Sequence, residues 1–159
     1  LHMLSASAFA GGGQPPTTIR NVGAFFTASA DRTLTLGPDL GAVTVTTAAT
    51  APNARLRTQY TVQPEYNKGI AINYNQSSGG SNRTIVISFT GAYIGGSAAL
   101  DHTQPDFAAL TGWNVIWGLV QGAVVQWSLT GVNFTTTNQG EFLDGAITTI
   151  ATRMGTTTP

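Results

Sequence analysis

The one cluster of titratable side chains in this charge-poor sequence spans residues 101–106, DHTQPD. It places the imidazole of His102 near two carboxylates, Asp101 and Asp106. Imidazole and carboxylate groups bind metal ions, and binding residues are often carried on long surface loops. The preferred interpretation is plainer: Asp and Thr cap a turn, and His102 is solvated or bonded to Asp101. Asp101, His102 and Asp106 are therefore a candidate metal site, while no cofactor is expected.

A second group of residues has the composition of a sugar-binding surface. Exposed aromatic rings can stack on the C–H faces of sugars while neighbouring amides bind the hydroxyl groups. Two tyrosines lie beside several amides in residues 66–76, and burial of both rings in the core is the competing interpretation. The candidate ligand-binding residues are Tyr66, Asn73, Tyr74, Asn75 and Gln76.

Signs of catalysis are weak. A hydrolytic triad needs a base, and apart from His2 the only histidine is His102. Glu141 and Asp144 would face opposite ways on a strand, whereas glycosidases hold two carboxylates across a cleft. The glycine-rich stretches lack the lysine and the strand-to-helix context of a phosphate loop. The sequence favours a protein that is not an enzyme and indicates no catalytic residue.

The charge pattern restricts the partners. Charged residues make up 9% of the chain and the formal net charge is zero, against about a quarter charged in ordinary domains. No basic stripe is present to bind phosphates or anionic lipids, so we expect no nucleic-acid partner and no membrane insertion. A single lysine leaves few charges to keep strand edges apart. This predicts that edges are covered by assembly in a homo-oligomer, for which a trimer is one candidate.

Both ends are expected to lie outside the folded domain. Residues 1–3 resemble the remnant of a cloning junction, and GGGQPP at 11–16 has the composition of a flexible and then stiff linker. Residues 1–16 would form a flexible arm, either disordered, as termini often are, or clasped onto a neighbouring subunit. The domain would occupy residues 17–154, followed by a frayed tail at 155–159.

Short Thr- and Val-rich segments separated by Gly, Pro and Asn turns run along the whole domain. AVTVTT at 42–47, GIAINY at 69–74 and RTIVISF at 83–89 are the clearest strands. Residues 140–154 fit a strand or a helix, and their Thr and Ile content favours a strand. The pattern predicts an all-β, single-domain antiparallel β-sandwich, jelly-roll or Ig-like, with about eight to ten strands.

The most apolar stretch, residues 113–132, is expected to form a central hairpin. Polar residues interrupt it, which argues against a membrane-spanning helix, and its Val, Ile and Trp content favours strands. A three-residue loop at 120–122 would give the hairpin one apolar face. The predicted core residues on that face are Trp113, Val115, Trp117, Val125, Trp127 and Leu129.

Several segments share a Gly-, Thr- and Val-rich composition: the Gly/Pro segment, the strands at 42–47 and 83–89, GAYIGG at 91–96 and the Thr-rich ends. In this overall composition the chain resembles the accessory β-modules of bacteriophage virions. Such modules include tail, fibre, spike and head-decoration domains. The resemblance implies a virion or extracellular-surface location and a non-enzymatic structural or attachment role, and it assigns no site residue. The partners expected with this role are copies of the chain, other virion proteins or a cell-surface glycan. A secreted carbohydrate-binding module and a small glycan-directed hydrolase are the alternative functions.

Overall fold

The computed structural model describes residues 1–11, 17–94, 98–137 and 140–159, which fold almost entirely into β-strands. The strands are β1 (His2–Ala10), β2 (Thr18–Phe26), β3 (Val43–Ala49), β4 (Arg55–Thr61), β5 (Gly69–Ser78), β6 (Ser81–Thr90), β7 (Ala99–Thr103), β8 (Val125–Phe134) and β9 (Ile147–Thr157). Short helical turns are η1 (Pro64–Tyr66), α1 (Gly91–Ile94) and η2 (Val115–Trp117). The predicted all-β class is confirmed.

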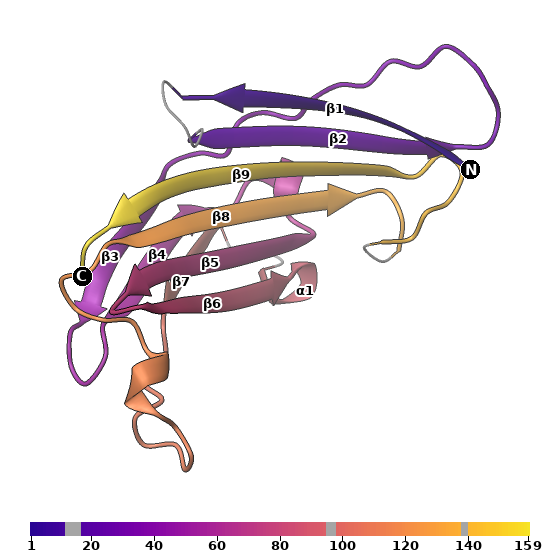
Figure 1. Ribbon diagram of the computed structural model, residues 1–159. Coiled ribbons are helices and arrows are strands. Elements are labelled where there is room, and N and C mark those ends of the chain that lie inside the picture. Colours follow the sequence, from indigo (N-terminus) through magenta and orange to yellow (C-terminus); the bar gives the residue numbers. More distant parts are fainter. Residues whose placement is uncertain (12–16, 95–97, 138–139) are drawn as a thin grey trace.

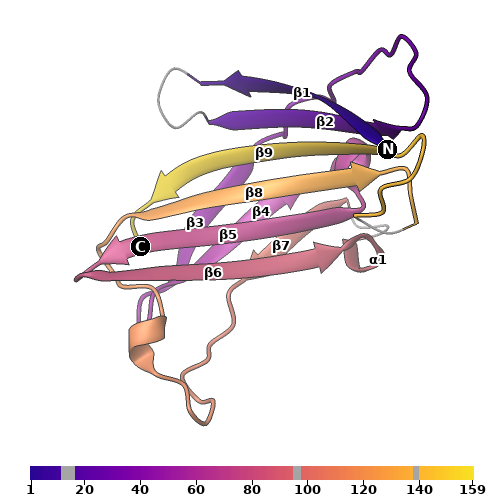
Figure 2. The same cartoon turned by 45° about the vertical axis from the view of Figure 1, so that its right-hand side comes forward.

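The strands form two antiparallel sheets that pack face to face (Figure 1). The larger sheet has six strands in the order β1-β2-β9-β8-β5-β6, and the smaller has three in the order β3-β4-β7. Figure 2 shows the smaller sheet lying behind one face of the larger. The predicted single-domain sandwich is therefore correct, and the described residues leave the opposite face of the larger sheet uncovered.

The core lies between the two sheets and follows the strand alternation. On β5, Ile70, Ile72 and Tyr74 are buried and belong to one hydrophobic cluster with Leu56 and Tyr60 of β4. Successive side chains on a strand point to opposite faces. The residues between them on β5 therefore lie on the open face.

The predicted flexible arm is wrong for its first ten residues. β1 pairs with β2 along its whole length, from His2↔Phe26 to Ala10↔Thr18, and so extends the larger sheet. Residues 12–16 of the expected arm lie outside the described residues. The expected frayed tail is also wrong, because β9 continues to Thr157 and the carbonyl of Pro159 accepts a hydrogen bond from Gly122 N at 2.7 Å.

Only the second half of the predicted central hairpin is a strand. Val125 and Leu129 on β8 are buried and Trp127 packs against the core, as predicted. The preceding residues form η2 and its flanking turns, and Trp117 is 55% exposed. The two edges of β8 are already taken by β5 and β9, so no edge remains with which residues 113–120 could pair.

The other two predicted core residues of this segment also lie at the surface. Val115 is exposed and Trp113 is partly exposed. The prediction of a core position is therefore wrong for Trp113, Val115 and Trp117. Apolar composition alone did not distinguish an inward-facing strand from an outward-facing loop.

Candidate functional site

The predicted metal ligands are directed to different places. Asp101 and His102 are neighbours on β7 and therefore point to opposite faces of the smaller sheet. Asp101 accepts a hydrogen bond from Arg57 Nε at 2.7 Å in a two-pronged ion pair, and this contact lowers the pKa of the Asp101 carboxyl. Asp106 forms a second ion pair, in which its Oδ2 atom lies 3.7 Å from Arg55 Nη2.

His102 points between the sheets rather than into solvent. Its ring packs edge-on against Phe89, with 5.1 Å between the ring centroids, and burial lowers the pKa of the imidazole. In the described part of the chain, no three His, Asp or Glu side chains are grouped so that they could hold a metal ion. Each of the two carboxylates is instead paired with an arginine.

The predicted sugar-stacking tyrosines are not exposed, which contradicts their proposed role. Tyr66 and Tyr74 are fully buried, and burial raises the pKa of both phenols. The Tyr74 hydroxyl shares a hydrogen bond with Thr58, while the Tyr66 hydroxyl donates to the carbonyl of Pro38 at 2.6 Å. Core packing, the competing interpretation, is correct for both rings.

The three amide residues of that group are divided between the faces of β5. Gln76 is buried and bonds the backbone before β8, whereas Asn73 and Asn75 lie on the open face. Asn75 accepts a hydrogen bond from Thr84 of the neighbouring strand at 2.8 Å. Its amide N–H groups are the donors that it can offer to a ligand.

The open face of the larger sheet is polar but uncharged. At the outward positions of its described strands, no Asp, Glu, Lys or Arg occurs, because Arg20, Arg83 and Arg153 all alternate to the inner face. Hydroxyl and amide groups predominate over β5, β8 and β9. Such a face can form neutral hydrogen bonds but attracts no ion.

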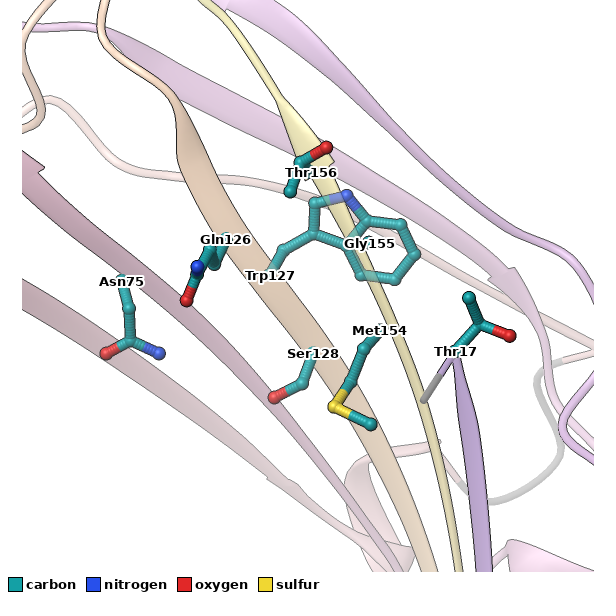
Figure 3. A pocket seen from close by; sticks show the side chains of 8 residues that line it. All are labelled: Thr17, Asn75, Gln126, Trp127, Ser128, Met154, Gly155 and Thr156. Carbon is teal, nitrogen blue, oxygen red and sulfur yellow. The ribbon is translucent and has the colours of Figure 1, made fainter. Parts of the chain in front are cut away.

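A shallow depression of about 370 Å³ lies on this part of the sheet (Figure 3). The residues that line it are Thr17, Asn75, Gln126, Trp127, Ser128, Met154, Gly155 and Thr156. Figure 3 shows the Trp127 indole lying across β9 at Gly155, the position where the absence of a side chain makes room for the ring. The outward-facing side chains of the depression are therefore amides, hydroxyls and the thioether of Met154, while the Trp127 indole lies on the inner face of the sheet and packs against the core.

The sequence prediction included Asn75 but not Gln126, Ser128 or Thr156. Gln126 and Ser128 alternate with the inward-facing residues of β8, so a polar-apolar alternation marks them in the sequence. Their proximity to Asn75 depends on the pairing of β8 with β5, in which Asn75 is opposite Gln126. Strands that are distant in sequence make this pair, and no local pattern predicts it.

The most unusual edge of the molecule is β1. It lies at the end of the larger sheet, and among the described residues only β2 pairs with it. Its register is unbroken over nine residues, and it contains no proline and no Asp, Glu, Lys or Arg. Met3, Leu4 and Phe9 are exposed. A long, regular and apolar edge whose outward backbone groups are unpaired is a template for another strand.

The opposite edge, β6, is different in kind. Its residues Ile85 and Ile87 pack against the core, and Arg83 donates to the carbonyl of Ile116 at 2.9 Å. The inward-facing side chains of β6 therefore pack on the rest of the sandwich. The large apolar side chains of β1, in contrast, are exposed to solvent.

No helix in the described residues is long and apolar enough to cross a lipid bilayer. In comparisons with family models, curated proteins and solved structures, nothing matches this chain.

Proposed function

We propose that this protein is a non-enzymatic structural module of a virion or other surface, and that it assembles with copies of itself through β1. The observation that carries the proposal is the open, regular and uncharged edge of that strand. Pairing with a second β1 would satisfy its free backbone groups and continue the larger sheet from one copy into the next. A two-fold axis makes such a contact antiparallel and self-complementary.

The residues of β1 favour one register. If the two-fold axis passes at Ala6, Met3 of each copy lies opposite Phe9 of the other, and Ser5 lies opposite Ser7. Cross-strand pairs of large apolar residues and of hydroxyl residues each stabilise a sheet by about 0.2–1 kcal/mol. The exposed Met3 and Phe9 side chains would then cover one another.

A cysteine at position 6 tests this contact, since the chain contains no other thiol. In the proposed register, the two position-6 side chains are about 5 Å apart. We expect Ala6→Cys to give a covalent dimer with a short bis-thiol crosslinker, whereas Val86→Cys, at a 58%-exposed site on β6, should not.

Two outcomes would contradict this contact. One is an Ala6→Cys protein that stays uncrosslinked at concentrations where light scattering shows an oligomer. The other is crosslinking only in a mixture of the two variants, which would indicate head-to-tail pairing of β1 with β6.

Binding of a neutral carbohydrate is a second candidate function, and the depression of Figure 3 favours it. Sugars are uncharged and present hydroxyls beside C–H surfaces, which matches the amides, the hydroxyls and the apolar Met154 side chain around it. The hydrolase alternative has less support, because three of the seven acidic side chains, Asp39, Asp101 and Asp106, are paired with arginines.

A glycan array tests the carbohydrate candidate. We expect Gln126→Ala, in the depression, to reduce binding by about tenfold, since a buried sugar hydroxyl would lose its partner. Val86→Ala, outside the depression, is the control. Absence of any bound glycan, or equal binding by both variants, would reject the carbohydrate candidate without affecting the β1 contact.

A further inference from the structure

Residues 107–124 form a lobe that projects from the sandwich between β7 and β8 (Figures 1 and 2). No charged residue occurs in the sequence from 107 to 140. The lobe nevertheless exposes several large apolar side chains: Leu110, Val115, Ile116, Trp117, Val120 and Val124. Val115, Ile116 and Trp117 follow one another in η2, and a group of exposed large apolar side chains often marks a site of interaction.

The lobe is held in a defined conformation. Trp113 packs on Phe107 at 5.1 Å and edge-on against Trp117 at 5.7 Å between ring centroids. Asn114 caps η2 by accepting a hydrogen bond from Ile116 N at 3.1 Å. Trp117 is therefore presented on a fixed support, which reduces the entropy lost when it binds.

The backbone of η2, which lies between the far end of the lobe and the sandwich (Figures 1 and 2), has its own hydrogen-bond partners. The carbonyl of Val115 accepts from Asn53 Nδ2 at 2.8 Å, and that of Ile116 accepts from Arg83 Nε at 2.9 Å. The amide of Trp117 bonds the carbonyl of Asn114 at 3.0 Å. An apolar medium could therefore contact this part of the lobe without leaving these backbone groups unpaired, which is the main condition for entering lipid.

We propose that the lobe binds the surface of an electrically neutral phospholipid bilayer, with Ile116 and Trp117 entering the boundary between headgroups and acyl chains. Tryptophan favours this boundary, and an uncharged lobe brings no ion into it. The lobe is a convex projection, which suits a deformable lipid surface. The expectation from the sequence was no membrane insertion, and this proposal concerns attachment at the interface only.

The lobe and β1 lie at opposite sides of the sandwich in both views, so the lipid proposal does not rest on the β1 contact (Figures 1 and 2). The lobe itself carries no Lys or Arg, and the nearby Arg83 of β6 is engaged with the carbonyls of Ile116 and Ser78 instead of being offered to anionic headgroups. Binding is therefore expected to be insensitive to salt and to added anionic lipid.

Flotation of the full chain with phosphatidylcholine vesicles tests the proposal. We expect the protein to float with the vesicles and its tryptophan emission to shift to shorter wavelength. Ile116→Asp, at a 61%-exposed site, should lower the partition coefficient by at least about tenfold. The matched control Val86→Asp, on the open face, should leave it unchanged.

Three results would overturn the lipid proposal. The unmodified protein could fail to float, or both variants could lose binding equally. The third result is that Ile116→Asp reduces the size of the oligomer in a solution that contains no vesicles. That result would assign the lobe to a contact between copies of the protein. Crosslinking of Ala6→Cys is expected to survive Ile116→Asp, so failures of the two proposals are distinguishable.

Discussion

Replacement of Tyr66 by alanine is expected to destabilise the protein by about 3–5 kcal/mol, a large part of the stability of a domain of this size. The ring is 0% exposed and lies against β8, where a Cβ added at Gly131 would stand 2.7 Å from Tyr66 Cβ. Its hydroxyl also donates to the carbonyl of Pro38 in the connection between β2 and β3. The substitution would leave a cavity and free that connection at once.

The two contributions of Tyr66 can be separated by urea unfolding. Tyr66→Phe keeps the ring and loses one hydrogen bond, so we expect a cost of about 1–2 kcal/mol. Tyr93→Ala is the control, because Tyr93 is exposed on α1 and surface substitutions usually change stability by less than about 0.5 kcal/mol. Similar unfolding free energies for Tyr66→Ala and Tyr93→Ala would show that Tyr66 does not hold the core.

Strand alternation is the part of this fold that the sequence predicts well. On β5, the alternation of Ile70, Ile72 and Tyr74 with small or polar residues indicates a buried face, and the same pattern places Asn73 and Asn75 on the other side. Applied strictly, this rule assigns Tyr74 to the core. The amides beside the tyrosine suggested a binding surface instead, although they belong to the opposite face.

The predictions that were wrong, the central hairpin and the flexible arm, concern segments whose structure depends on strands distant in sequence. Trp117 has the composition of a core residue, but it can be buried only if its segment finds a free strand edge, and β8 has none to offer. The first ten residues are mildly apolar and precede a linker-like segment, which favoured an arm, yet β2 provides an edge on which they form a strand. Local pattern gives the tendency to form a strand, whereas competition for edges decides which segments pair.

The β1 edge and the depression also differ in how far the sequence alone predicts them. The β1 edge can be inferred from a run without charge or proline once a sheet is known to end there. The depression requires the order β9-β8-β5, which brings residues about 28 and 51 positions apart in the chain together by strand pairing alone. A single sequence carries no direct signal for that order.

Gln76 is expected to be the most important polar residue between the sheet and the lobe. Its side chain is buried at the end of β5, and its amide nitrogen donates to the carbonyls of Val120 at 2.9 Å and Ala123 at 3.0 Å. Its carbonyl oxygen accepts from Val120 N at 2.8 Å. One side chain therefore satisfies three backbone groups where the lobe returns to the sandwich.

Gln76→Leu would keep most of the volume and leave those three backbone groups without their partner. We expect a loss of about 2–4 kcal/mol in the free energy of unfolding, since each unsatisfied buried group costs about 1–3 kcal/mol and water can reach some of them. Amide hydrogen exchange should also become faster in residues 113–124, because the lobe loses its attachment to β5. Gln126→Leu, exposed on the open face of β8, is the matched control and should be nearly neutral. If both substitutions lowered stability equally, or if exchange in the lobe stayed unchanged, Gln76 could not be the residue that fixes the lobe to the sheet.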